Sequence, residues 1–110
     1  MNKGLLLAVM LTASLGRITF NDHPETWYDL NMDRVISRAQ ENGIVNEYWE
    51  RADGCKMYGH YIIVAADWNI HPYGSIVQTS RGDGIVLDTH TTQDRTTVDI
   101  AVTWGKGGAK

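Results

Sequence analysis

The chain has 110 residues, of which 43% are hydrophobic and 21% charged, with eleven glycines and two prolines. This size and composition are typical of one globular domain and exclude a disordered chain as the default. The formal net charge is −3, and the basic residues form only isolated pairs at Arg34/Arg38 and Lys106/Lys110. That pattern argues against a nucleic-acid partner.

The lone cysteine limits the chemistry that thiols can contribute. Because Cys55 has no second cysteine to pair with, an internal disulfide and a zinc site built from paired thiols are both excluded. We expect Cys55 to be a small, half-buried residue. The sequence predicts no cofactor.

Residues 1–16 have the features of an export signal. Lys3 supplies positive charge, residues 5–15 (LLLAVMLTASL) are mostly apolar, and Ser14 and Gly16 are small residues before a cut after Gly16. Eleven residues are too few to span a bilayer, so no stable membrane insertion is expected. The sequence thus predicts a secreted or cell-wall-associated protein. The alternative is a buried N-terminal helix or strand of a cytoplasmic or virion protein.

The first half of the remaining chain predicts a hairpin and a helix. Residues 18–28 (ITFNDHPETWY) combine β-prone segments with a turn and indicate a strand or hairpin arm. From Asn31 the apolar residues recur with a period of 3.6, and Gly43 suits the end of a helix. One amphipathic helix is therefore expected over about 31–42.

Short strands are expected in the second half. Residues 44–60 are mixed and contain an Asp53-Gly54 turn signal, and YIIVAAD (61–67) is typical of a strand buried on both faces. A Pro/Gly turn and a strand follow in 71–80, and RGDG (81–84) is a tight turn into IVLD (85–88). In 98–104 (VDIAVTW) the alternation places Trp104 on the face of Val98, Ile100 and Val102. One helix followed by short strands favours a mainly β fold, a small β-barrel with a helical addition.

Three aspartates end or interrupt these apolar segments. Asp67 follows IIVAA, Asp88 follows IVL, and Asp99 lies within VDIAV. A carboxylate at the end of a buried strand loses hydration, so its pKa rises unless a cation or several donors compensate, and Arg95 is the only obvious cation. A carboxyl group with a raised pKa is what protonation of a glycosidic oxygen near neutral pH requires. Alternatively, each aspartate accepts backbone N–H bonds at a strand end or turn.

The order of these motifs resembles the three-aspartate domain family, the double-psi β-barrel module related to membrane-bound lytic transglycosylase A and to stationary-phase survival proteins. The residues that carry the resemblance are Ala65-Ala66-Asp67, the turn from His71 to Val77, Asp88-Thr89-His90-Thr91, and Val98-Asp99-Ile100. The lead-in DGCKMYG also resembles a subgroup from Gram-positive bacteria and their phages. The resemblance implies a six-stranded double-psi β-barrel over residues 17–104, with one N-terminal amphipathic helix and a flexible tail at 105–110.

For function, the resemblance implies cleavage of the β-1,4 bond between N-acetylmuramic acid (MurNAc) and N-acetylglucosamine (GlcNAc) in peptidoglycan glycan strands. The muramyl 6-hydroxyl attacks the anomeric carbon and leaves a 1,6-anhydro product. Asp88 is the expected acid/base, and Asp99 and Asp67 tune its pKa and bind sugar hydroxyls. The expected substrate-binding residues are Thr89, His90, Tyr73 and Trp68.

Some interpretations remain open from the sequence. His90 and Thr91 stand where the family has two glycines, so they narrow the cleft, contact the substrate or mark a lost activity. His90 is also a candidate for a charge pair with Asp88, or for a metal site with His71 or His60. Trp49, Tyr58, Trp68 and Tyr73 either stack on sugar rings or fill the core. The alternative functions are a non-catalytic sugar-binding barrel and a phage-associated structural protein.

Overall fold

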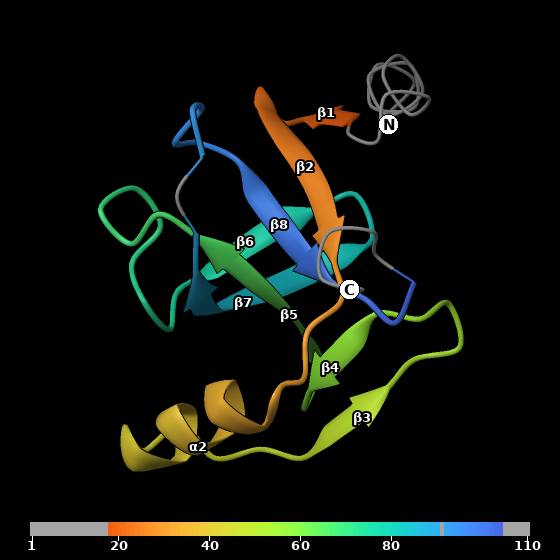
Figure 1. Cartoon of the computed structure of the whole chain (residues 1–110), viewed down its shortest axis with the longest axis vertical. Coiled ribbons are helices and arrows are strands. Elements are labelled where there is room, and N and C mark those ends of the chain that lie inside the picture. Colours follow the sequence, from red (N-terminus) through yellow and green to blue (C-terminus); the bar gives the residue numbers. More distant parts are fainter. Residues whose placement is uncertain (1–17, 91, 105–110) are drawn as a thin grey trace.

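One mixed β-sheet and one helix make up residues 18–90 and 92–104, the part of the chain described by the computed structural model (Figure 1). The elements are β1 (Ile18–Phe20), β2 (His23–Tyr28), α2 (Asp33–Glu41), β3 (Tyr48–Glu50), β4 (Lys56–Tyr58), β5 (Tyr61–Ala66), β6 (Ile76–Thr79), β7 (Gly82–Thr89) and β8 (Val98–Ala101). The predicted signal (1–16) and tail (105–110) lie outside the described residues. No helix in the described ranges is long and apolar enough to cross a membrane.

Helix α2 forms where the 3.6-residue period predicts it. Its apolar side buries Val35 and Ala39, while Asp33 and Arg34 are exposed. Asn31 Oδ1 accepts the Asp33 N–H at 2.8 Å, which satisfies one of the free donors of the first turn. The residue that follows the C-cap, Gly43, has φ +82°, a left-handed conformation that glycine adopts at little cost and that ends the helix.

The sheet is built around β5. The strands of the sheet lie in the order β1-β2-β8-β5-β4-β3. In addition, β7 pairs with β5, and β6 pairs with β7. The β5/β7 and β2/β8 pairs are parallel, and the other pairs are antiparallel. Among the described strands the sheet is open, with eight strands, and no pairing closes it into a barrel. The predicted mainly β fold with one helix is confirmed, and the six-stranded closed barrel stays a prediction.

Both faces of β5 are buried, as the apolar run predicts. On one face Val64 packs with Val86 and Ile100 in one core cluster. On the other, Ile63 packs with Leu87 and with the apolar side of α2 in a second cluster. We call this second side of the sheet the helix face.

A β-bulge interrupts the pairing of β5 with β7. Val64 pairs with Val86, but the next residue of β5, Ala65, pairs with Asp88. Leu87 is therefore an extra residue in β7. Because side chains alternate between the faces of a strand, this one-residue shift puts Asp88 opposite Ala65 rather than opposite Ala66.

Two expectations at the edges of the core are wrong. Cys55 is fully buried rather than half-buried, because it bridges Val102 and packs inside the first core cluster. Trp104 is 48% exposed rather than facing the core with Val98 and Ile100. Strand β8 ends at Ala101, and the alternation of faces does not continue as far as Trp104.

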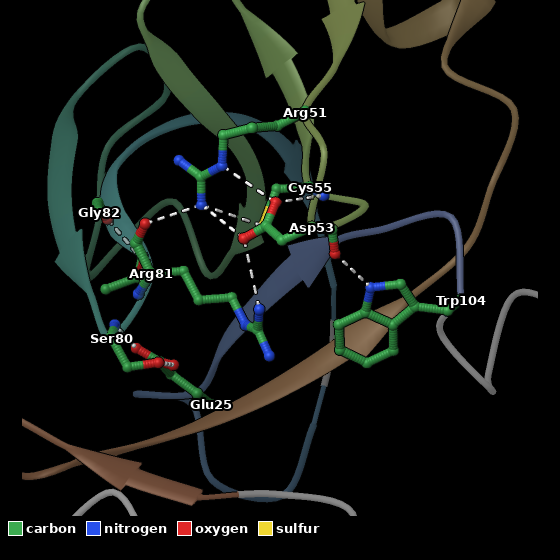
Figure 2. Close-up of polar contacts among 9 residues, drawn as sticks. Glu25, Arg51, Asp53, Cys55, Ser80, Arg81, Gly82 and Trp104 are labelled. Carbon is green, nitrogen blue, oxygen red and sulfur yellow. Dashed lines mark hydrogen bonds and ion pairs between the residues drawn. The ribbon is translucent and has the colours of Figure 1, made fainter. Parts of the chain in front are cut away.

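A polar network lies near the start of β7 (Figure 2). It joins the β3–β4 turn, the β6–β7 turn and the segment that follows β8. The Asp53 carboxylate accepts two hydrogen bonds from Arg51, at 3.0 and 2.8 Å, and a longer one from Arg81 at 3.4 Å. Trp104 Nε1 donates to the Asp53 carbonyl at 2.9 Å, and the Arg81 guanidinium lies 5.1 Å from the centre of the Trp104 ring system.

A buried carboxylate lies beside this network. Glu25 of β2 is fully buried, and it accepts hydrogen bonds from the backbone N–H and the hydroxyl of Ser80, at 2.8 and 2.6 Å. These bonds tie β2 to the β6–β7 turn. A buried carboxylate without such donors would be costly, so this pairing stabilises the arrangement of the two elements.

Candidate functional site

Two of the three predicted aspartates flank one residue of β5. Ala65 pairs with Asp88 of β7 on one side and with Asp99 of β8 on the other. Paired residues of neighbouring strands lie on the same face of a sheet, and two strand spacings put the two aspartate Cα atoms about 10 Å apart. The row continues to Thr26 of β2, which pairs with Asp99. Asp88 and Asp99 therefore share the helix face. Figure 1 shows β5 and β7 ending side by side at the left of the view.

Asp88 is held by three neighbours. Its Oδ2 accepts a hydrogen bond from the hydroxyl of Tyr28 at 2.9 Å, and its Oδ1 accepts one from the backbone N–H of Thr89 at 2.9 Å. Trp68 Nε1 donates to the Asp88 carbonyl at 2.9 Å. Burial raises the pKa of the Tyr28 hydroxyl well above its ordinary value, and the Asp88 charge adds to that rise. Tyr28 is thus a neutral donor that orients one carboxylate oxygen.

Asp99 is the aspartate with a raised pKa. Burial raises the pKa of its carboxyl above 3.8, and the Asp88 charge acts in the same direction. The hydroxyl of Thr26, which donates to Asp99 Oδ1 at 2.8 Å, and the nearby His90 act in the opposite direction. The expectation of a raised acid at a buried strand therefore holds for Asp99.

Asp67 meets the exception to that expectation, because a cation and a backbone donor compensate for its lost hydration. Arg95 Nε donates to Asp67 Oδ2 at 2.6 Å, and the backbone N–H of Asn69 donates to Oδ1 at 2.9 Å. The hydrogen bond from Arg95 lowers the pKa of Asp67 below 3.8, the Asn69 N–H adds to this, and a charge on His90 has a smaller effect in the same direction. The cation and the backbone donor compensate for lost hydration, so this aspartate is ionised.

The two predicted aromatic residues of the β5–β6 loop lie together beside Asp88. The Trp68 and Tyr73 rings meet edge to face with centroids 5.0 Å apart, and Trp68 remains 37% exposed. The other two aromatic candidates do not join them. Tyr58 is fully buried and donates to the Ile44 carbonyl, and Trp49 donates to the Gly59 carbonyl from the β3–β4 hairpin.

A groove of about 590 Å³ runs from Asp88 along the start of α2. Arg34 and Arg38 line its helix side, together with Asp33 and Val35, and Leu30 and Asn31 lie before the helix. Arg38 Nη1 donates weakly to the Leu87 carbonyl at 3.4 Å, and its guanidinium lies 5.9 Å from the centre of the Trp68 ring system. Of the three aspartates, Asp88 is the one that lines this groove.

His90 is turned toward the loop that precedes β8. Its Nε2 lies 2.8 Å from the Thr97 carbonyl, so Nε2 carries the proton, and its Nδ1 is buried with no hydrogen-bond partner among the described residues. His71 instead meets His23, with ring centroids 6.1 Å apart. Within residues 18–90 and 92–104, no group of three or more His, Cys, Asp or Glu side chains could hold a metal ion. Thr91 lies outside the described residues.

Three further residues contact the site and were not among the predicted ones. Tyr28 and Thr26 hydrogen-bond to Asp88 and Asp99, and Arg38 borders the groove. Tyr28 lies 60 positions from Asp88 in sequence and Thr26 lies 73 positions from Asp99, so only the parallel pairing of β2 with β8 brings them into place. Arg38 was visible as a cation on the polar side of the predicted helix.

No protein-family model, curated protein or solved structure matches the chain.

Proposed function

We propose that this chain is a peptidoglycan lytic transglycosylase that cleaves the β-1,4 bond between MurNAc and GlcNAc and releases 1,6-anhydro-muramyl products. The observation that carries the proposal is the placement of Asp88 and Asp99 on one face, on either side of Ala65, with a groove beginning at Asp88. Membership of the three-aspartate family, and a six-stranded double-psi β-barrel as its fold, are parts of the same proposal.

In the proposed reaction Asp88 is the acid and then the base. Its carboxyl gives a proton to the glycosidic oxygen as the bond from the anomeric carbon to that oxygen breaks. The carboxylate then takes the proton of the muramyl 6-hydroxyl while that oxygen bonds to the anomeric carbon. Since the nucleophile belongs to the substrate, no second carboxylate has to lie at the distance that hydrolysing glycosidases need.

The neighbouring groups have supporting roles in this proposal. Asp99, on the same face as Asp88, tunes the acidity of Asp88 and binds sugar hydroxyls, and Asp67 with Arg95 offers a charged pair to sugar hydroxyls. Trp68 and Tyr73 present ring surface on which a sugar stacks. The partner is the peptidoglycan glycan strand, at a secreted or cell-wall-associated location, or in association with a phage.

The test is direct. Purified protein is incubated with peptidoglycan and the soluble muropeptides are analysed by mass spectrometry, with Asp88→Asn as the matched control and a known transglycosylase as the positive control. We expect anhydro-muramyl products from the wild type and none from Asp88→Asn. If the positive control is active and the wild type releases no anhydro products, the proposed activity is refuted.

A non-catalytic sugar-binding protein is the second candidate, and His90 favours it. The imidazole stands where the resembled family has glycine, and it is partly buried against Thr97. This candidate predicts that the wild type sediments with insoluble peptidoglycan without releasing products, and that Asp88→Asn sediments equally well. Failure of the wild type to sediment counts against both functions.

A further inference from the structure

Two arginines lie on the groove side of α2 without a strong partner. Arg34 and Arg38 are four residues apart, which places them one above the other on the helix surface, and both line the groove that begins at Asp88. Arg38 makes one weak hydrogen bond, at 3.4 Å, and neither residue forms an ion pair within the described residues. Most of their guanidinium donors are therefore free to bind a ligand.

Arg38 lies in the last turn of α2, where the helix dipole favours a cation, but Arg34 adds nothing to the stability of the helix. Like charges four residues apart repel each other, and Arg34 stands in the first turn, where the helix dipole disfavours a cation. Asp33, beside Arg34 in sequence, and Asp88 are the acids lining the groove. An anion bound between the two guanidinium groups would relieve the repulsion, and the planar fork of arginine matches a carboxylate.

We propose that Arg34 and Arg38 form a carboxylate-binding subsite that selects glycans with an acidic muramyl residue. The inference rests on the proposed function, because it takes the groove at Asp88 as the glycan site. Two carboxylates share this chemistry, the free group of the 3-O-lactyl substituent and those of the stem peptide attached to it. The subsite makes the groove prefer acidic glycans over neutral chitin fragments of the same length.

Binding is measured by calorimetry with three tetrasaccharide probes. One contains MurNAc with free lactyl groups, one contains MurNAc carrying a dipeptide stem with its own carboxylate, and one is chitotetraose, which is neutral. The proteins are the wild type, Arg34→Gln/Arg38→Gln, and Arg81→Gln. The last removes one positive charge at the other end of β7, where the double variant removes two at the groove, and controls for loss of a charge away from the groove. Circular dichroism establishes that each variant is folded.

We expect the double variant to bind at least one acidic probe roughly tenfold more weakly, as the loss of a charge-assisted interaction implies, and to bind chitotetraose unchanged. The acidic probe that loses affinity identifies which carboxylate the two arginines bind. Added salt should weaken the binding of this probe to the wild type but not to the double variant. Arg81→Gln should behave as the wild type does.

The inference is overturned if the wild type binds acidic and neutral probes equally, or if the double variant loses affinity for all three to the same degree. Failure of the proposed function looks different. If the wild type binds acidic probes through the arginines but releases no anhydro products from peptidoglycan, the subsite stands and the proposed catalysis fails. If the wild type binds none of the probes, both are rejected.

Discussion

Gly54→Ala should destabilise the fold chiefly through a clash with Trp104. Gly54 has φ +91°, and a Cβ there would lie 2.5 Å from Cδ1 and Nε1 of Trp104 and 2.9 Å from Oγ1 of Thr103. Trp104 has room to move because it is half exposed, but its Nε1 bond to the Asp53 carbonyl and its contact with Arg81 hold it in place. Gly43 is a matched control, since its φ is +82° and a Cβ there would meet nothing within 4 Å.

The expected cost follows from these contacts. Gly43→Ala incurs only the backbone strain, about 1 kcal/mol. In Gly54→Ala, loss of the Trp104 hydrogen bond adds about 1 kcal/mol and loss of its cation–π contact adds about 0.5–1 kcal/mol. The total cost is about 3 kcal/mol. At roughly 4–8 °C per kcal/mol for a domain of this size, Gly54→Ala should melt about 8–16 °C below Gly43→Ala.

The measurement is a double-mutant cycle by urea denaturation, with Gly54→Ala and Gly43→Ala each made in the wild type and in a Trp104→Ala background. Without the indole, Gly54→Ala should cost less than in the wild type, since the backbone strain and the contact with Thr103 Oγ1 remain but the clash with Trp104 is gone. The reasoning is refuted if Gly54→Ala costs the same in both backgrounds, or if the two glycines cost the same in the wild type.

Three further variants probe the aspartates. Because burial raises the pKa of Asp99, folding favours its protonated form, and this stabilisation is complete below pH 3.8 and is lost as the pH rises through the raised pKa. Asp99→Asn should therefore raise Tm at neutral pH and change it little below pH 3.8; an equal effect at both would contradict the shift. Tyr28→Phe removes the donor to Asp88 Oδ2 and should slow release of anhydro-muramyl products roughly tenfold, with sedimentation on peptidoglycan unchanged. Unaltered product release would exclude a positioning role for Tyr28. Arg95→Gln should raise the pKa of Asp67 toward 3.8 in an NMR titration, and an unmoved pKa would show that the ion pair does not form in solution.

Local chemistry made much of the fold predictable. The helix follows from the 3.6-residue period and from Gly43, the β3–β4 hairpin from Asp53-Gly54, and β5 from an unbroken apolar run. Each of these signals lies within about ten residues. The wrong expectation for Trp104 arose because alternation alone does not reveal where pairing with a neighbouring strand ends.

The site was less predictable because long-range pairing assembles it. The sequence indicated which aspartates to consider, but the contact of Tyr28 with Asp88 depends on the position of β2 beside β8. The sequence also offered Arg95 as the one obvious cation, without showing which aspartate it neutralises. Asp67 and Asp99 have similar apolar settings in sequence, and only the fold shows that their pKa values move in opposite directions.

The extra residue in β7 belongs to the core, and the register of the site does not depend on it. Exchanging Leu87 for another apolar residue keeps Asp88 opposite Ala65, so the carboxylate stays on the helix face. Deleting Leu87 would restore regular pairing, in which the residue after Val86 lies opposite Ala65, and that residue would then be Asp88. The deletion would therefore keep Asp88 beside Asp99, and its cost would be to stability, because it removes the fully buried Leu87 side chain from the second core cluster.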